Sequence, residues 1–401
     1  MLLLASGAQA QSLAPRSLFI DDRGANLFDT EGAEGGIRAG LFDVRAALGL
    51  SFGMDSNVYA APEAEEQGLA TGEALLRARK KTETRDILGL GYVRARRFED
   101  ARDQDATEYG AVGRYDAWID PQNRLTAGVT AERNIESRAD IETPTDIALS
   151  PFNDLRAGIS HLHVFNRFAL ESSVDGRRVE YEADGQSFRD RWQYRGELRG
   201  IYRLRADFSW IASAYYNRDE FDDASAFALS AETAGGLLGL RFDVPELLEM
   251  EVGAGYFERR YLDSPAALAD TTLTALEGVA LRGSLRWFPT RLTTVRAQLL
   301  RSDAPTRLAG SSAKVRNDAS LGFTHEYSRN LLLHAGARYI ADDFEDLDRL
   351  DEAWLAELGM TWGFGRHSVL RFQYDFATRE HASLGRGFDR HVLNLAYIAR
   401  L

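Results

Sequence analysis

The sequence has no cysteine and no long apolar run, and each absence excludes a class of protein. With Cys 0 in 401 residues, disulfide frameworks, thiol nucleophiles and cysteine-bearing zinc sites are excluded. No stretch of about 18 apolar residues is present, so no segment could cross a bilayer as an α-helix. The formal net charge of −13 argues against nucleic acid as a partner. Hydrophobic residues still make up 44% of the chain, which is too many for a disordered polymer.

The first residues resemble the end of a secretory signal peptide. A short apolar run precedes Ala8-Gln9-Ala10, which has the small-x-small pattern of a cleavage site. The basic start of such a peptide is missing, so we interpret residues 1–10 as a truncated signal peptide. Residues 11–40 are polar and glycine-rich, and we expect a periplasmic N-terminal segment there. The rest of the chain, 41–401, is expected to form one domain.

From residue 41 onward, apolar and polar residues alternate in segments of about ten residues or slightly more. Phe208, Trp210, Ala212, Ala214 and Tyr216, for example, all share one parity. A period of two indicates strands, because successive side chains of a strand face opposite sides. We count about eighteen such segments, or sixteen if the weakly alternating segments near 153–165 and 229–243 are not strands.

The connections between these segments alternate between short turns, such as 120–123 and 328–330, and longer acidic loops, such as 56–71 and 138–151. This alternation is typical of outer-membrane barrels. The sequence therefore predicts an all-β fold, a closed antiparallel transmembrane β-barrel with short periplasmic turns and longer extracellular loops. The alternative is a soluble all-β protein, such as a sandwich array or a propeller. The strongly charged second parity of the strands argues against it.

Aromatic residues gather near the expected strand ends, which suits the interfacial girdles of a barrel. The girdle candidates are Tyr92, Tyr115, Tyr202, Trp287, Tyr327, Trp362 and Tyr397. With aromatic residues outward, the opposite parity should line a lumen. The lumen-lining candidates are Asp43, Arg45, Glu73, Arg77, Arg114, Asp116, Glu132, Glu171, Asp175, Arg195, Glu197, Arg199, Asp207, Glu249, Glu251, Arg282, Arg286, Arg296, Arg316, Asp318, Arg338, Glu357, Arg371 and Asp375.

The expected lumen wall carries both signs of charge, and no ring of one sign is visible. Such a wall could form many hydrogen bonds with hydrated sugars or small polar solutes. It could equally consist of cross-strand pairs that only solvate a water-filled lumen. Both interpretations fit the pattern.

The sequence contains few signs of a catalytic or metal site. No G-x-S-x-G, H-E-x-x-H or phosphate-loop motif is present. His161 and His163 share one strand face, but no third ligand is close in the sequence. We therefore expect no enzyme activity, no cofactor and no metal site.

A resemblance adds to this pattern. The tract Asp55-Ser56-Asn57-Val58-Tyr59 closes the first expected strand, and Arg94-Ala95-Arg96-Arg97-Phe98 follows later. In these two tracts the chain resembles the β-barrel porin 2 family, outer-membrane barrels associated with exopolysaccharide synthesis and export. The resemblance implies a polymer-conducting or porin-like barrel and transfers no catalytic residue.

Three functions follow as hypotheses for a barrel in the outer membrane of a Gram-negative bacterium. The first is a conduit for the export of exopolysaccharide or capsular polysaccharide. Its partners would be outer-membrane lipid and lipopolysaccharide, a periplasmic polysaccharide export protein and the polysaccharide cargo. The alternative is a diffusion porin, or a substrate-specific uptake porin, for small polar solutes. The third is a structural or adhesin-like barrel without a transport role.

Overall fold

A computed structural model describes residues 37–136, 149–223, 229–262, 275–306, 311, 313–345, 347–381 and 387–400. No helix in these ranges is long and apolar enough to cross a membrane. Two short 3-10 turns occur, η1 (Arg102–Gln104) and η2 (Ser187–Arg189). The strands are β1 (Ile37–Ala39), β2 (Phe42–Asp55), β3 (Gln67–Lys81), β4 (Arg85–Phe98), β5 (Ala106–Trp118), β6 (Asn123–Ile135), β7 (Pro151–Val164), β8 (Phe168–Tyr181), β9 (Arg191–Arg205), β10 (Phe208–Phe221), β11 (Ala231–Val244), β12 (Leu248–Tyr261), β13 (Leu276–Thr290), β14 (Thr293–Ala304), β15 (Lys314–Ser328), β16 (Leu331–Phe344), β17 (Arg349–Gly363), β18 (Ser368–His381) and β19 (Phe388–Arg400).

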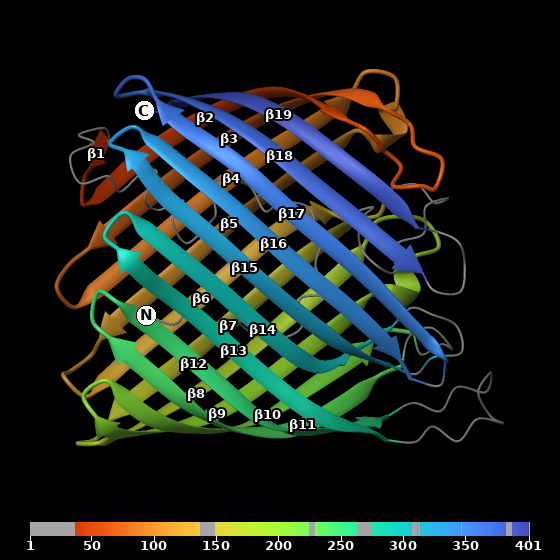
Figure 1. The fold of residues 1–401 in the computed structure, drawn as a ribbon. Coiled ribbons are helices and arrows are strands. Elements are labelled where there is room, and N and C mark those ends of the chain that lie inside the picture. Colours follow the sequence, from red (N-terminus) through yellow and green to blue (C-terminus); the bar gives the residue numbers. More distant parts are fainter. Residues whose placement is uncertain are drawn as a thin grey trace.

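Strands β2 to β19 form a closed antiparallel barrel of eighteen tilted strands, as the sequence predicts (Figure 1). Each strand pairs with its neighbours in the sequence, and β19 pairs with β2 to close the ring. Closure is a physical requirement, because hydrocarbon offers no partner to an unpaired backbone N–H or C=O group.

The seam between the first and last barrel strands is staggered. Strand β19 pairs with β2 from Val392 opposite Asp55 to Arg400 opposite Ala47, so the start of β2 extends beyond the end of β19. The additional strand β1 pairs with this extension, with Ile37 opposite Val44 and Ala39 opposite Phe42. Strand β1 therefore covers an edge that would otherwise remain unpaired.

The two ends of the barrel differ in the length of their connections, as predicted. At the turn end, shown at the left of Figure 1, strands are joined by 82–84, 119–122, 165–167, 206–207, 245–247, 291–292, 329–330 and 364–367. The longer connections are at the opposite end, the loop end. The first long connection covers 56–66 and is shorter than predicted. Strand β3 begins earlier than expected, because its first residue, Gln67, already pairs with Asp55 of β2. Gly68 and Gly72 had weakened the apolar pattern there.

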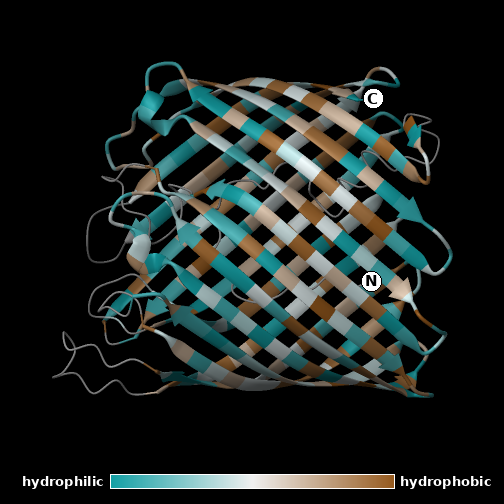
Figure 2. Cartoon of the chain, turned by 180° about the vertical axis from the view of Figure 1, so that it is seen from behind, coloured by the Kyte–Doolittle hydropathy of each residue, from teal (hydrophilic) through white to brown (hydrophobic). Residues whose placement is uncertain are grey.

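Hydropathy alternates along the strands (Figure 2), and the apolar positions face outward. Large apolar side chains such as Phe52, Leu198 and Leu238 are exposed on this face. Five of the predicted girdle residues are also exposed: Tyr202, Trp287, Tyr327, Trp362 and Tyr397. Tyr92 was assigned wrongly. It alternates with the exposed Val93 and donates a hydrogen bond to Glu132 of β6, 3.0 Å away, on the inner face.

The wall bends sharply at β11 and β12. A Cβ atom on Gly255 would lie 1.8 Å from the carbonyl oxygen of Gly236, and one on Gly239 would lie 2.4 Å from that of Val252. Both positions therefore require glycine. The bend brings side chains of β9 within reach of β12 and β13, although β10 and β11 lie between them.

Candidate functional site

The lumen face consists of the strand positions that alternate with the exposed apolar side chains. All but one of the predicted lumen residues occupy such positions in β2 to β18. The prediction was wrong at Asp207, which lies in the turn 206–207 rather than in a strand. Its carbonyl oxygen accepts a hydrogen bond from the backbone N–H of Asp243, which links the turn to β11.

Further charged residues on the lumen face did not appear in the sequence prediction. The additional basic residues are Arg79, Lys81, Arg94, Arg96, Arg124, Arg156, Arg177, Arg191, Arg203, Arg241, Arg259, Lys314, Arg349, Arg379, Arg390 and Arg400. The additional acidic residues are Asp55, Asp86, Glu108, Asp154, Asp219, Asp243, Glu326, Asp342 and Asp351. Together with the predicted set, basic side chains outnumber acidic ones on the described lumen face.

Ion pairs connect many of the predicted residues along the wall. Asp116 binds Arg114 of its own strand and Arg124 of β6. Asp318 of β15 binds Arg338 of β16, on the neighbouring strand. These pairs satisfy charges in the wall, as one of the two interpretations of the pattern expected. Other candidates have neutral partners, such as Asp375, which accepts a hydrogen bond from Gln373 at 2.7 Å.

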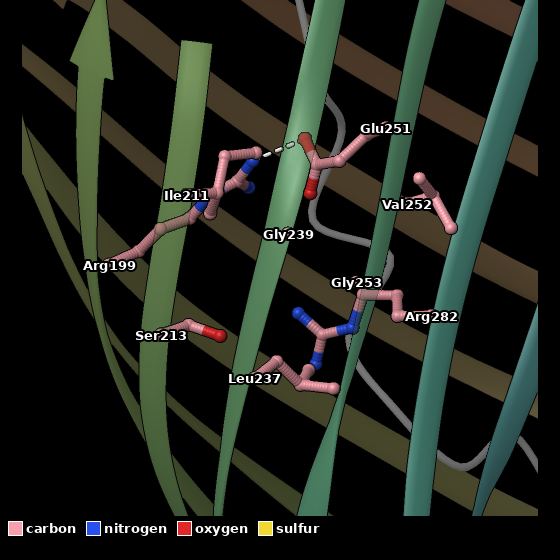
Figure 3. A pocket seen from close by; sticks show the side chains of 9 residues that line it. All are labelled: Arg199, Ile211, Ser213, Leu237, Gly239, Glu251, Val252, Gly253 and Arg282. Atoms are coloured by element: carbon pink, nitrogen blue, oxygen red, sulfur yellow. Dashed lines mark hydrogen bonds and ion pairs between the residues drawn. The ribbon is translucent and has the colours of Figure 1, made fainter.

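The bend in the wall creates a small pocket on the lumen side of β9 to β13 (Figure 3). Arg199 of β9 binds Glu251 of β12 across it. Arg282 of β13 donates to Glu197 of β9 at 2.9 Å. Gly239 and Gly253 form part of the floor and leave room for these long side chains. Two arginine side chains therefore line the same pocket.

Near the loop end, the β14–β15 hairpin separates from β13, while β15 stays paired with β16. Pairing of β13 with β14 stops at Leu281 and Arg301, whereas β14 and β15 stay paired up to Ala304 and Lys314. Asp303 accepts hydrogen bonds from Thr233 of β11 at 2.7 Å and from Arg259 of β12 at 2.9 Å. Both partners lie on the lumen face. We call residues 303–306 and 313–315 the inward end of this hairpin.

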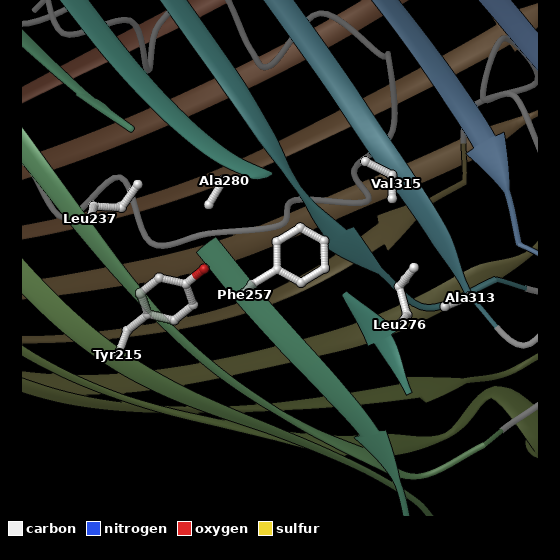
Figure 4. Close-up of a cluster of buried hydrophobic side chains, with 7 residues drawn as sticks. All are labelled: Tyr215, Leu237, Phe257, Leu276, Ala280, Ala313 and Val315. Atoms are coloured by element: carbon white, nitrogen blue, oxygen red, sulfur yellow. The ribbon is translucent and has the colours of Figure 1, made fainter. Parts of the chain in front are cut away.

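The inward end rests on an apolar part of the lumen face. Ala313 and Val315 contact a buried cluster formed by β10 to β13 (Figure 4). The wall residues of this cluster are Tyr215, Leu237, Phe257, Leu276 and Ala280. Arg259 is 2% exposed and binds both Asp219 and Asp303, which holds the inward end against the wall. The inward end therefore lies on the lumen side of β11 to β13.

Buried ion pairs surround the rest of the loop end. Lys314 and Arg316 bind Asp342 at 2.7 and 2.6 Å. Asp154 binds both Arg156 and Arg177, and its side chain is 1% exposed. Further buried pairs at this end are Arg189 with Glu136, Arg349 with Asp351 and Arg390 with Asp55. The loop end is thus the densely packed end of the channel.

Beyond the strands, two carboxylates of the loop end are held in their charged form. Hydrogen bonds from Arg133 lower the pKa of Glu182, and hydrogen bonds from Arg178 lower the pKa of Asp222. In contrast, burial raises the pKa of Asp190. Glu182 and Asp222 therefore stay charged in their ion pairs with arginine.

The tract 55–59 lies at the seam. Asp55 is fully buried and binds Arg390 of β19, whose Nε lies 3.0 Å from its Oδ1. Asn57 donates side-chain hydrogen bonds to the carbonyl oxygens of Ala61 and Asp389 at 2.7 and 3.1 Å. Val58 packs between β3 and β4. The tract therefore fixes the first loop to both sides of the seam.

The two histidines of β7 do not form a metal site with other described residues. His161 and His163 share one hydrogen-bond partner, the Oδ1 atom of Asn123, at 3.0 and 2.8 Å. They lie on the outer face, since they share the parity of the exposed Ile159. Within the described ranges, no group of three or more His, Asp or Glu residues is arranged to hold a metal ion.

Three solved structures are among those similar to the chain. OpdL of Pseudomonas aeruginosa is 10% identical, with 90% of this chain and 98% of that chain covered and a TM-score of 0.44. OccAB3 of Acinetobacter baumannii is 13% identical, with 89% and 99% covered and a TM-score of 0.43. OccK9 (OpdG) of P. aeruginosa is 13% identical, with 89% and 98% covered and a TM-score of 0.46. A comparison with curated proteins finds no significant match.

A family model gives a more specific result. The model described as "Putative beta-barrel porin 2" matches residues 31–400, which is nearly the whole chain and includes every barrel strand. The match agrees with the closed barrel, its apolar outer face and its charged lumen face. The chain belongs to this β-barrel porin 2 family and is a porin of the outer membrane of a Gram-negative bacterium.

Proposed function

We propose that this porin lets small polar solutes diffuse into the periplasm through a water-filled lumen. The observation that carries the proposal is the inward end of β14–β15, which Arg259 holds against the lumen face. A fixed constriction inside a charged wall suits small solutes. The constriction sets an upper limit on the size of a solute that can pass, and polar groups of the wall replace part of the water that hydrates it. The protein acts as a channel in this proposal and not as an enzyme.

Export of polysaccharide has less support from the chain. That hypothesis rested on the resemblance at 55–59 and on the mixed charges of the wall. In this chain Asp55 and Asn57 close the seam, a role that is independent of the cargo. The mixed charges are largely engaged in ion pairs. A periplasmic export protein and a polysaccharide cargo therefore remain predictions of the export hypothesis alone.

Deletion of the gene distinguishes the two functions. The proposal expects normal surface polysaccharide, measured by carbohydrate staining, together with slower growth on one or more polar carbon sources at low concentration. The purified protein should also make liposomes swell in small solutes and not in oligosaccharides above a size limit. Loss of surface polysaccharide with normal growth on every carbon source would contradict the proposal and favour export.

A further inference from the structure

The distribution of charge over the barrel differs from that of the whole chain. The formal net charge is −13. On the described lumen face, however, basic side chains outnumber acidic ones. The excess of acid therefore lies outside the described lumen face. Side chains that face a narrow lumen determine the potential that a solute experiences there. The protein is acidic overall, but its described lumen face carries a net positive charge.

Strand β9 contributes most to this lumen charge. Arg191, Arg195, Arg199 and Arg203 recur at every fourth residue on its lumen face. This spacing places one guanidinium about every 13 Å, from the loop end to the turn end. Glu197 is the one carboxylate between them on β9. The strand therefore carries a basic ladder along the whole height of the wall.

The neighbouring strands balance this ladder only on one side. On β8, Asp175 lies opposite Arg195, and Glu171 lies opposite Arg199. On β10, the lumen positions that face the ladder are uncharged from Ser209 to Asn217, and the first carboxylate is Asp219 at the loop end. On the side toward β10, the arginines of the ladder therefore have no carboxylate on the adjacent strand until Asp219.

Two arginines and a serine line the pocket at the bend in the wall. The Nε atom of Arg199 is buried and has no hydrogen-bond partner. Arg282 extends into the same space from β13, and the hydroxyl of Ser213 points there too (Figure 3). Guanidinium and hydroxyl groups donate hydrogen bonds to carboxylates. Glu197 and Glu251 keep each arginine partly engaged, which makes any such binding weak and reversible.

We propose that the lumen prefers anions, and that Arg199, Arg282 and Ser213 form a weak subsite for carboxylate-bearing solutes. The proposal deepens the proposed function and rests on it. A solute with a carboxylate would follow the basic ladder of β9 and pause at the pocket. Weak binding at such a subsite is what conduction requires, because a tightly held solute would block the channel.

The test is the reversal potential of the purified protein in a planar lipid bilayer under a gradient of KCl. The proposal expects a reversal potential displaced toward the equilibrium potential of chloride. In a gradient of potassium acetate, the carboxylate probe, the displacement should have the same sign. The double variant R199Q/R282Q should shift the reversal potential toward that of potassium, because it removes two positive charges from the lumen.

A matched control changes the same kind of charge on the other face. Arg260 lies on β12, and its outward-facing side chain is 64% exposed. The variant R260Q should therefore leave the reversal potential unchanged. A preference for potassium in the unmodified protein, or equal shifts in R260Q and in the lumen variant, would overturn the anion preference alone. Complete absence of conductance would instead overturn the proposed channel, and the anion preference with it.

Discussion

A buried ion pair at the seam should contribute more to the stability than an exposed ion pair of the same strand. The side chain of Asp55 is fully buried, and that of its partner Arg390 is 15% exposed. Asp43 also pairs with an arginine, Arg45, but its side chain is 53% exposed. A buried ion pair loses much more than an exposed one when one partner is removed, because the other charge stays behind without compensation.

The variant D55A should therefore destabilise the barrel by about 3–5 kcal/mol, whereas D43A should cost about 0–1 kcal/mol. The measurement is the temperature at which the folded band disappears in semi-native electrophoresis. Equal temperatures for both variants would contradict the assigned role of the seam pair.

The assignment of faces leads to a second residue-scale prediction. Leu321 of β15 is 55% exposed on the outer face. Its neighbour Gly322 faces the lumen, and a Cβ atom there would meet nothing within 4 Å. The variant L321R should cost about 2–4 kcal/mol if the residue lies near the midplane of the membrane. G322R should fold with little loss, measured as yield of the heat-modifiable form. Similar yields of both variants would show that the faces are assigned wrongly.

Alternation let the sequence predict the lumen face, but it did not show where an aromatic residue turns inward. Tyr92 and Phe257 lie on the lumen face because Glu132 and the inward end offer them partners. Those partners are distant in the sequence, and a local pattern contains no information about them. Asp303 has the outward parity of Leu299 and reaches Arg259 only because the hairpin separates from β13. Asp207 was misassigned because a turn can continue the parity of the preceding strand.

At the scale of an element, the hairpin of β14 and β15 has two parts with different roles. Its turn end pairs normally in the wall, and its inward end lies across the lumen faces of β11 to β13. The sequence predicts both strands, because alternation is local. It does not predict that they separate from β13, since this depends on Arg259 binding Asp219 and Asp303.

Removing that contact should widen the channel. The variant R259Q leaves Asp219 and Asp303 buried without their cation, and this favours release of the inward end. The expected result is a larger single-channel conductance and a larger size limit in liposome swelling. R260Q, which changes the adjacent outward-facing arginine, provides the matched control and should behave like the unmodified protein. Unchanged conductance in R259Q would show that the inward end does not limit passage.

At the scale of the whole molecule, the number and order of the strands were predictable. The alternation of short and long connections fixes the order of the hairpins. An even number of strands places the start of the first strand and the end of the last strand at the turn end. The small strand β1 was not predicted, because it covers an edge that exists only after β19 has closed the ring at Ala47. The bend at Gly239 and Gly255 was also not predictable, since single glycines are frequent throughout the strands.

A closed barrel makes a prediction that concerns the complete molecule. Every strand from β2 to β19 has two hydrogen-bonded neighbours, so detergent finds no exposed edge at which unpairing could begin. The protein purified from the membrane fraction should therefore resist SDS at room temperature and change its mobility only after boiling. D55A should lose this resistance at a lower temperature than D43A, because Asp55 joins the first and last strands of the barrel at the seam. Identical mobility before and after boiling, together with recovery in the soluble periplasmic fraction, would rule out a closed membrane barrel.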